Sequence, residues 1–376
     1  MPISNTSHKG ETKAANIVRS TLRIDLDAIS ANYNLLKNKV APASCAAVVK
    51  ADAYGLGVEY VAPRLWQEGC RIFFVASIDE AITLRNTLPK AEIIALNGLM
   101  PGEVEYYCTH RILPTLNDLG QIDTWATFCR KHQPMPAAVH LDTGMSRLGL
   151  SRAEQNSLAE CPAQLHDFEF RYLLSHLACA DCPEHSMNER QRADFFEISN
   201  RLPTTQRSLA ASSGIFLGKG WHFEMVRAGI CLYGGAPNDT LPKSIASVIR
   251  LDGIVLQIRD VDSPETVGYG ATHQFTDKSR IATIAVGYAD GYLRSASKKT
   301  KAYWGEIALP LVGRVSMDLI TFDATKAREL KAGDSVQLIG PHYDINEFSA
   351  DAGTIPYEIL TSLGRRYRRQ YFGSNK

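Results

Sequence analysis

The sequence has no marked excess of charge of either sign. Its 41 Lys and Arg residues nearly balance 40 Asp and Glu residues, for a formal net charge of +1. Such a chain has no strong electrostatic attraction for nucleic acid or acidic membranes, so we expect neither as a partner. No apolar run reaches membrane-spanning length. Residues 1–20 are polar and lack the apolar core of a signal peptide, which predicts a flexible leader on a cytoplasmic protein.

Cysteine is also scarce, and its placement excludes a disulfide framework. All eight cysteines lie between Cys45 and Cys231, several inside apolar runs, as is typical of reduced thiols in the cytoplasm. One group, Cys179 and Cys182 flanked by His176 and His185, resembles a zinc site. Four ligands within ten residues would be cramped for structural zinc. We therefore predict a strand end and a loop here, and no metal.

What the sequence does contain is a repeated alternation of apolar runs with amphipathic stretches. Repeated βα units predict parallel strands, and eight of them predict closure into a barrel. The fold class is therefore α/β, with a TIM-like (β/α)8 barrel over residues 21–242. The eight strand-like runs are Cys45–Lys50, Arg71–Ala76, Glu92–Asn97, Arg111–Thr115, Ala137–Asp142, Phe170–His176, Leu209–Ser212 and Val226–Leu232.

The pattern changes after about Pro242. Short strand-like runs separated by Gly, Pro, Asp and Lys follow, and no long helical pattern appears before Tyr357–Leu363. Residues 243–376 are therefore predicted to form a mainly β C-terminal domain. An alternating segment at residues 21–26 predicts a further strand that pairs with either domain. The basic segment 365–371 is interpreted as a solvated edge strand.

Lys50 stands at the end of the first barrel strand, directly after a continuous apolar run. A lysine there is costly to desolvate unless it is paired or used. Burial also lowers its pKa and provides the neutral amine that Schiff-base chemistry needs. Taken alone, the segment equally allows an ordinary lysine whose amine reaches solvent.

The ends of the other barrel strands favour the catalytic interpretation, because barrel enzymes place their sites at this face. Two arginines and a histidine lie there, and hydroxyl and glycine residues follow strands seven and eight, where phosphate groups bind. Together with Lys50 they indicate pyridoxal phosphate as cofactor. The residues at these strand ends are Tyr54, Arg147, His176, Ser212, Arg227, Gly229 and Ile230.

Several longer segments make the chain similar to the alanine racemase family, in order, from about Leu22 to its end. They include Val48-Val-Lys-Ala-Asp-Ala-Tyr-Gly55, Leu141-Asp-Thr-Gly-Met-Ser-Arg-Leu-Gly149, Ser175-His-Leu-Ala178, Arg227-Ala-Gly-Ile-Cys-Leu-Tyr-Gly234, Val267-Gly-Tyr-Gly270, Val286-Gly-Tyr-Ala-Asp-Gly291, Gly313-Arg-Val-Ser-Met-Asp318 and Tyr357-Glu-Ile-Leu360.

The resemblance implies a pyridoxal-phosphate enzyme that interconverts L- and D-alanine, an amino-acid substrate, and a homodimer with shared sites. Racemisation needs a base on each face of the α-carbon. Lys50 would serve the D-enantiomer, and Tyr269 from the partner subunit would serve the L-enantiomer. A network with His176 and Arg227 would stabilise the Tyr269 phenolate.

The resemblance also implies binding roles. Arg227 would face the pyridine nitrogen and keep it unprotonated, which disfavours transamination. Arg147 would hold the cofactor's phenolic oxygen and the substrate carboxylate, helped by the backbone amide of Met317 from the partner. The phosphate would lie on Tyr54, Ser212, Gly229, Ile230 and Tyr357. Asp181, Tyr288, Arg294 and Arg314 would line the entry channel, although ordinary surface charge pairing explains them equally well.

Three positions depart from the family pattern. His140 stands where many relatives have a carbamylated lysine that positions the arginine, which leaves the anionic partner of Arg147 open. Ala211 replaces a frequent asparagine, and Ser316 replaces a common cysteine. These changes bear on rate and specificity rather than on reaction type.

Alternatives remain open at this level. A racemase of broader range, acting on serine or basic amino acids, would use the same scaffold. A decarboxylase of the same fold class is less expected, because Tyr269 opposite Lys50 suits two-base proton transfer. A non-catalytic cofactor carrier built from the barrel alone would stop near residue 240. The sequence does not separate supply of D-alanine for peptidoglycan from its catabolism.

Overall fold

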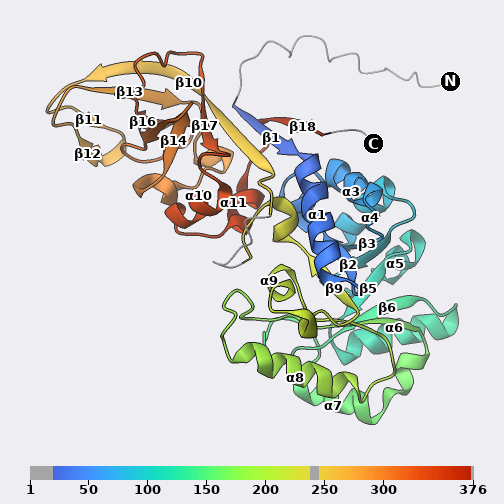
Figure 1. Cartoon of the computed structure of the whole chain (residues 1–376). Helices are drawn as coiled ribbons and strands as arrows, with labels where there is room; N and C mark the ends of the chain where they lie inside the picture. Colours follow the sequence, from blue (N-terminus) through green and yellow to red (C-terminus); the bar gives the residue numbers. More distant parts are fainter. Residues whose placement is uncertain (1–19, 238–244, 374–376) are drawn as a thin grey trace, which may run out of the picture.

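A computed structural model describes residues 20–237 and 245–373 of the chain. The predicted leader lies outside these residues apart from Ser20, and so does the predicted domain limit at residue 242. Figure 1 shows two bodies, one of alternating strands and helices and one of mainly β-structure. Within the described residues, no helix is both long and apolar enough to cross a membrane.

The first body is an eight-stranded parallel barrel, as predicted. The strands follow the order β8-β7-β6-β5-β4-β3-β2-β9, and a parallel bridge between Ala211 and Arg227 joins the two ends. Fully buried apolar side chains such as Phe73 and Ile93 fill its core. The strands are β2 (Ser44–Val48), β3 (Ile72–Val75), β4 (Glu92–Ala95), β5 (Leu113–Leu116), β6 (Pro136–His140), β7 (Glu169–Leu174), β8 (Gln206–Ser208) and β9 (Met225–Ala228).

Helices follow most of these strands, and several begin at a side chain that caps the first turn. Ser77, Asp118 and Ser151 each accept a hydrogen bond from a backbone amide of the helix that follows. The helices of the first body are α1 (Leu26–Val40), which precedes the first barrel strand, α2 (Lys50–Tyr54), α3 (Val58–Gln67), α4 (Ile78–Thr87), α5 (Val104–His110), α6 (Leu119–Lys131), α7 (Arg152–Glu160), α8 (Met187–Ser199) and α9 (Ser212–Ile215). Short 3-10 turns are η1 (Pro162–His166), η2 (Lys219–Trp221) and η3 (Ile230–Tyr233).

Most predicted strand limits differ from the observed ones by a few residues, and three of these differences change the element to which a strand-end residue belongs. The seventh strand ends at Ser208, and Ser212 opens the short helix α9 instead of closing a strand. The eighth ends at Ala228, because Gly229 (φ −126°, ψ −103°) leaves the extended conformation and η3 follows. The first ends at Val48, so that Lys50 opens the turn α2. Apolar composition alone does not separate a strand from the buried turn after it.

The second body is built on an eight-stranded sheet with two helices. The first strand of the described chain, β1, belongs to this sheet, where it pairs antiparallel with β10 and parallel with the edge strand β18. The sheet contains β1 (Thr21–Asp25), β10 (Ile249–Val261), β13 (Ser279–Ile284), β14 (Lys301–Trp304), β15 (Ile307–Pro310), β16 (Ile320–Asp323), β17 (Ser335–Ile339) and β18 (Arg368–Phe372). Its helices and turns are α10 (Ile345–Ala352), α11 (Pro356–Ser362), η5 (Tyr288–Asp290) and η6 (Arg294–Lys298).

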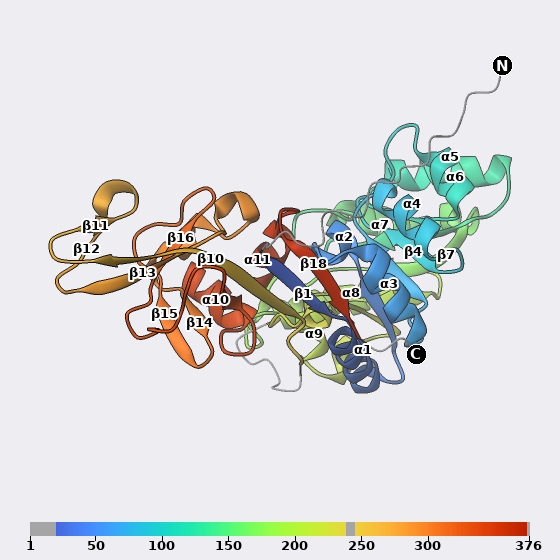
Figure 2. The same ribbon diagram turned by 90° about the horizontal axis from the view of Figure 1, so that it is seen from above.

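Helix α10 contradicts the expectation that no helix precedes Tyr357. Asp344 and Glu347 form a capping box at its start, which is a readable sequence signal of a helix N-terminus. The separate hairpin of β11 (Thr266–Val267) and β12 (His273–Gln274) encloses the turn η4 (Tyr269–Ala271). Both views place this hairpin at the end of the second body remote from the barrel (Figures 1 and 2).

The turn after η5 packs against the end of α11 and yields a stability prediction. Gly291 has φ +88°, and a Cβ there would lie 1.8 Å from the Ser362 carbonyl oxygen. Gly305 has φ +56°, and a Cβ at that position would meet nothing within 4 Å. A left-handed non-glycine residue costs roughly 1–2 kcal/mol. We expect Gly291→Ala to lose clearly more stability than Gly305→Ala in urea unfolding, because only Gly291 adds a backbone clash; equal losses would contradict the close approach.

Candidate functional site

A cavity of about 1440 Å³ opens at the carboxyl ends of the barrel strands. It is the place where the barrel strand ends converge, and α11 of the second body contributes to its wall. The residues predicted from the sequence that line it are Lys50, Tyr54, Arg147, His176, Asp181, Ser212, Arg227, Gly229, Ile230 and Tyr357.

Lys50 is partly buried in this cavity, and its amine makes no hydrogen bond or ion pair with a described residue. Burial lowers the pKa of the Lys50 amine, and the charges of Arg147 and Arg227 lower it further, whereas the Glu80 carboxylate opposes them. The surroundings therefore favour a neutral amine that is able to act as a nucleophile or base.

Arg227 lies fully inside the barrel and is held by backbone oxygens rather than by an acid. Its Nη1 donates to the Ser208 carbonyl (2.8 Å) and hydroxyl (2.7 Å), and its Nη2 donates to the Ser175 carbonyl (2.6 Å). Burial lowers the pKa of Arg227 to about 10, so it stays protonated at neutral pH. The Nε hydrogen has no acceptor among the described residues and remains a donor at the cavity wall.

His176 takes its tautomer from Arg227. The Nη2 atom lies 3.3 Å from the His176 Nδ1 atom. Because a guanidinium only donates, Nδ1 must accept, and we assign the ring hydrogen to Nε2. Burial, with the nearby cations, lowers the pKa of His176 to about 3, so the ring is neutral. Neutral His176 thus offers a hydrogen-bond donor away from Arg227.

His140 has the opposite tautomer. The side-chain nitrogen of Asn117 donates to the Leu96 and Thr115 carbonyls. The side-chain oxygen of Asn117 must therefore accept from the His140 Nδ1 atom, which lies 2.8 Å away. Burial lowers the pKa of His140 to about 4, helped by Arg227. The position therefore holds a neutral ring with its Nε2 lone pair unused, not an anion as a carbamylated lysine would provide.

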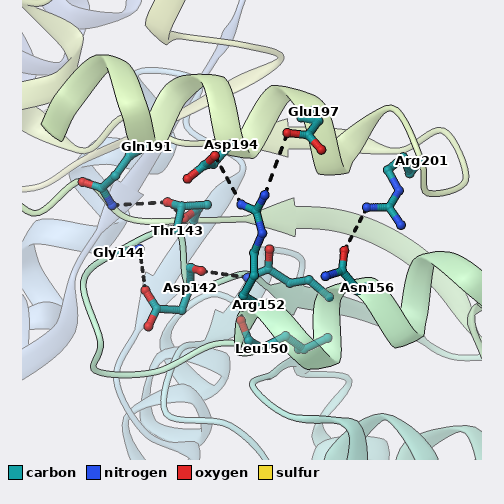
Figure 3. A network of polar contacts seen from close by, with 12 residues as sticks. Asp142, Thr143, Gly144, Leu150, Arg152, Asn156, Gln191, Asp194, Glu197 and Arg201 are labelled. Carbon is teal, nitrogen blue, oxygen red and sulfur yellow. Dashed lines mark hydrogen bonds and ion pairs between the residues drawn. The ribbon is translucent and has the colours of Figure 1, made fainter. Parts of the chain in front are cut away.

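The loop that presents Arg147 is rigidly anchored (Figure 3). The Asp142 carboxylate accepts a hydrogen bond from the Gly144 amide at 2.8 Å. It also accepts from the amides of Met145 (2.8 Å) and Ser146 (3.1 Å). Gln191 of α8 donates to the Thr143 hydroxyl at 3.2 Å. Arg147 itself is exposed and forms no ion pair with a described residue, which leaves its guanidinium available to an anionic ligand.

The helices behind this loop are also tied together. Arg152 of α7 pairs with Asp194 (3.2 Å) and Glu197 (4.0 Å) of α8, and Arg201 donates to the Asn156 side chain at 2.9 Å. Surface pairs of this kind contribute little energy individually. Their common effect is to connect the two helices that flank the Arg147 loop.

A second group of free donors gathers beside Tyr54. The Ser212 hydroxyl accepts from the Gly229 amide at 2.9 Å and has its own hydrogen to donate. The Ile230 amide and the Tyr54 and Tyr357 hydroxyls have no acceptor among the described residues. A Cβ at Gly229 would lie 2.6 Å from the Tyr54 hydroxyl oxygen, so only glycine allows this approach. These donors fit a phosphate group.

The remaining predicted residues do not line the cavity of their own chain. Tyr269, Met317 and Tyr288 are exposed, by 72%, 54% and 42%. They nevertheless lie near one another on the second body. A Cβ built on Gly270, the neighbour of Tyr269, would lie 3.3 Å from a side-chain nitrogen of Arg314. The Tyr288 amide donates to the carbonyl of Ser316, the neighbour of Met317. Arg294 joins them through Ser297, which accepts from the Val315 amide and donates to the Arg294 carbonyl.

Sequence reasoning missed Asn117 and Glu80. Asn117 directly follows β5, the same position at which the other site residues stand, so strand-end placement was a usable signal. Glu80 lies in the first turn of α4 and accepts from the Ala51 amide, next to Lys50. A helix-start glutamate is common, and nothing in the sequence separates this one from others.

The Cys179–Cys182 segment forms a loop beside the cavity. Asn188 of α8 holds it by donating to the carbonyls of both cysteines, at 3.1 and 3.0 Å. The Cys179 sulfur lies 3.8 Å from that of Met187, and Cys182 is exposed. Among residues 20–237 and 245–373, no three His, Cys, Asp or Glu side chains are grouped to hold a metal.

The two neutral histidines predict acid sensitivity. Their folded pKa values lie below the ordinary value of 6.5, so the unfolded chain binds more protons and stability falls as pH drops from about 6.5 toward 4. Each such proton adds roughly 1.4 kcal/mol per pH unit to that slope. We expect His140→Asn to show a shallower loss in urea unfolding at pH 7 to 4.5. Replacement of the exposed His166 by Asn should leave the slope unchanged, and a His140 variant with the wild-type slope would contradict this origin.

Models of known families match both bodies of the chain. The alanine racemase N-terminal domain matches residues 24–237, and the alanine racemase C-terminal domain matches residues 248–371. The alanine racemase of Brucella abortus is 47% identical over 367 residues, covering 93% of each chain. That of Rhodospirillum rubrum is 45% identical over 357 residues, covering 94% of this chain and 96% of the relative.

Solved structures agree with the sequence matches. An alanine racemase from Bartonella henselae with covalently bound pyridoxal phosphate superposes with a TM-score of 0.92, at 44% identity, over 95% of this chain and 100% of that one. The biosynthetic alanine racemase of Pseudomonas aeruginosa gives 0.88 at 32% identity, with the same coverage. The predictions of family, fold and enzyme class are confirmed: the chain belongs to the alanine racemase family.

Proposed function

We propose that the protein interconverts L- and D-alanine with pyridoxal phosphate, in a homodimer whose two sites each use residues of both subunits. The observation that carries this proposal is the position of the Lys50 amine, unpaired at the barrel mouth between Arg147, Arg227 and a group of free phosphate-type donors. Family membership supplies the reaction, and the geometry of this chain supports the roles that we propose for its residues.

The donors around the cavity fit the cofactor. Tyr54, Ser212, Ile230 and Tyr357 would hold the phosphate, and the free Nε hydrogen of Arg227 would lie against the ring nitrogen. When bound, pyridoxal phosphate withdraws electrons from the substrate and so makes its α-proton acidic. Because Arg227 remains protonated, it would keep the facing ring nitrogen unprotonated and so would limit that withdrawal.

Lys50 has two tasks in this proposal. Its amine would hold the cofactor covalently, and the same amine would accept or return the α-proton on one face of the substrate. The lowered pKa of Lys50 keeps a usable neutral fraction. Arg147 holds the substrate carboxylate, since its guanidinium has no acidic partner among the described residues.

Tyr269 of the partner subunit would supply the base on the opposite face. In its own chain Tyr269 is 72% exposed, on the β11–β12 hairpin that both views place far from the barrel (Figures 1 and 2). An exposed aromatic cluster with Met317 and Tyr288 beside it is typical of a surface that another protein covers. Asp181 at one cavity wall and Tyr288, Arg294 and Arg314 of the partner would line the entry channel.

The thiols support a reducing compartment, and we propose a cytoplasmic location. All eight cysteines are free in the structure, and Cys161 and Cys182 are exposed. Disulfides are uncommon in the cytoplasm, where exposed thiols stay reduced.

The activity is tested by chiral chromatography of the purified protein with added pyridoxal phosphate. L-alanine should convert quickly to a near-equal mixture of enantiomers, whereas L-serine and L-lysine should convert slowly. Equal rates for serine or lysine would replace the alanine assignment with a broader racemase. Retention of cofactor without any racemisation would favour the carrier alternative.

Shared sites are tested by mixing two inactive variants. Lys50→Ala and Tyr269→Phe homodimers should each lose more than roughly 99% of activity, since removing an acid–base group costs about 10²–10⁴-fold. Exchange of subunits should restore activity, because a mixed dimer contains one site with both Lys50 and Tyr269. Exchange confirmed by native mass spectrometry without recovered activity would contradict a shared site.

A further inference from the structure

The turn that begins at Lys50 is left-handed. Ala51, Asp52, Ala53 and Tyr54 have φ between 53° and 56°, which is the left-handed helical region. Each such residue costs roughly 1–2 kcal/mol, and runs of four are avoided by ordinary L-residues. Contacts from elsewhere in the fold must therefore hold this turn.

Glu80 supplies the contact at the start of the turn. One carboxylate oxygen accepts from the Ala51 amide at 2.8 Å, and the other accepts from the Ala76 amide at 2.7 Å. Ala76 directly follows β3, and Ala51 directly follows Lys50. A single carboxylate therefore fixes the end of β3 and the residue after Lys50 relative to each other.

Glu80 is itself held in place. It is the third residue of α4, and its own amide donates to the Ser77 hydroxyl at the helix N-cap. In a capping box the glutamate at this position would accept from the amide of the cap residue. Here it accepts from Ala76 and Ala51 instead, so the carboxylate is used for the Lys50 turn rather than for its own helix.

Backbone hydrogen bonds and other side chains also hold the turn: the Val49 amide donates to the Phe74 carbonyl, and the Ala53 amide donates to the Val49 carbonyl, both at 2.9 Å. The Asp52 carboxylate accepts from the Val58 amide at 2.7 Å, and the Gly55 amide donates to the Ala51 carbonyl at 2.7 Å. Arg369 donates to the Gly55 carbonyl from β18. Among the described residues, Glu80 is the side chain that accepts the amide next to Lys50.

The geometry points to Glu80 as a positioning residue, which holds the left-handed turn and thereby sets where the Lys50 amine lies. Its negative charge also acts on Lys50, whose pKa it raises against the effects of burial and of Arg147. The inference deepens the proposed function and rests on it, since it assigns how Lys50 is aligned with the α-proton. Misplacement of a catalytic group by about 1 Å can lower the rate roughly 10²-fold.

The test compares Glu80→Ala and Glu80→Gln with Asp79→Asn in the full-length holoenzyme. Asp79 is exposed and precedes Glu80 in the same helix turn, and its carboxylate makes no hydrogen bond or ion pair with a described residue. Asp79→Asn therefore removes the same charge without removing a contact of the Lys50 turn. Glutamine keeps the length of glutamate but has one accepting oxygen for two amides. We therefore expect Glu80→Ala to disturb kcat and hydrogen exchange more than Glu80→Gln does. Asp79→Asn should behave like the wild type in both measurements.

Two readouts separate positioning from general damage. Hydrogen exchange by mass spectrometry should show residues 50–55 exchanging at least roughly tenfold faster in Glu80→Ala, because the Ala51 amide loses its acceptor. The kcat should fall roughly 10- to 100-fold with little change in KM. The deuterium isotope effect should rise with α-deuterated D-alanine, where Lys50 removes the proton, and fall with α-deuterated L-alanine.

The outcomes separate a failure of the Glu80 positioning role from a failure of the proposed racemase function. Exchange and isotope effects in Glu80→Ala that match those of Asp79→Asn would overturn the positioning role. So would a lower rate with both isotope effects unchanged. If Glu80→Ala does not fold, Glu80→Gln decides by the same readouts. Absence of racemisation in the wild type would remove the proposed function, while faster exchange in the Glu80 variants would still support the contact.

Discussion

The site depends on three basic side chains that are gathered at the mouth of the barrel. Lys50, Arg147 and Arg227 line one cavity, and none of them forms an ion pair with a described residue. Burying a charge such as that of Arg227 is costly unless a group of opposite sign lies nearby. A phosphate and a carboxylate are the two anionic groups that the proposed cofactor and substrate would bring, so the same gathering of basic side chains selects the ligand and lowers the pKa of Lys50.

The neighbouring histidines are consistent with this constraint. A protonated ring beside Arg227 would add to the repulsion, and both His140 and His176 have pKa values lowered to about 4 and 3. Asn117 fixes the ring hydrogen of His140 on Nδ1, and Arg227 fixes that of His176 on Nε2. His140 therefore has a free lone pair on Nε2, and His176 has a free hydrogen on Nε2. Neutral rings thus provide hydrogen bonding of both kinds without adding charge.

In the proposed dimer, the second body would carry the residues that the barrel of the partner lacks. Its long strand β10 leads away from the barrel, and the hairpin with Tyr269 lies at the far end (Figure 1). Tyr269, Tyr288, Arg314 and Met317 come from separate loops of this body, yet they lie on one surface. A polar, partly buried cavity and an exposed aromatic cluster within the same chain suit two copies that complete each other.

The sequence by itself determined the barrel, the lysine just after its first strand, and the arginines and hydroxyls near later strand ends. Hydrophobic period and strand-end placement are local properties, so they can be read without coordinates. The tertiary structure alone decided the left-handed turn after Lys50, the contact of Glu80 with it, and the tautomers of His140 and His176. These depend on groups that are distant in sequence, such as Ala51 and Glu80 or His140 and Asn117. Only folding brings such groups within hydrogen-bond distance, because the strand order, and not the order of residues, sets which strand ends are neighbours.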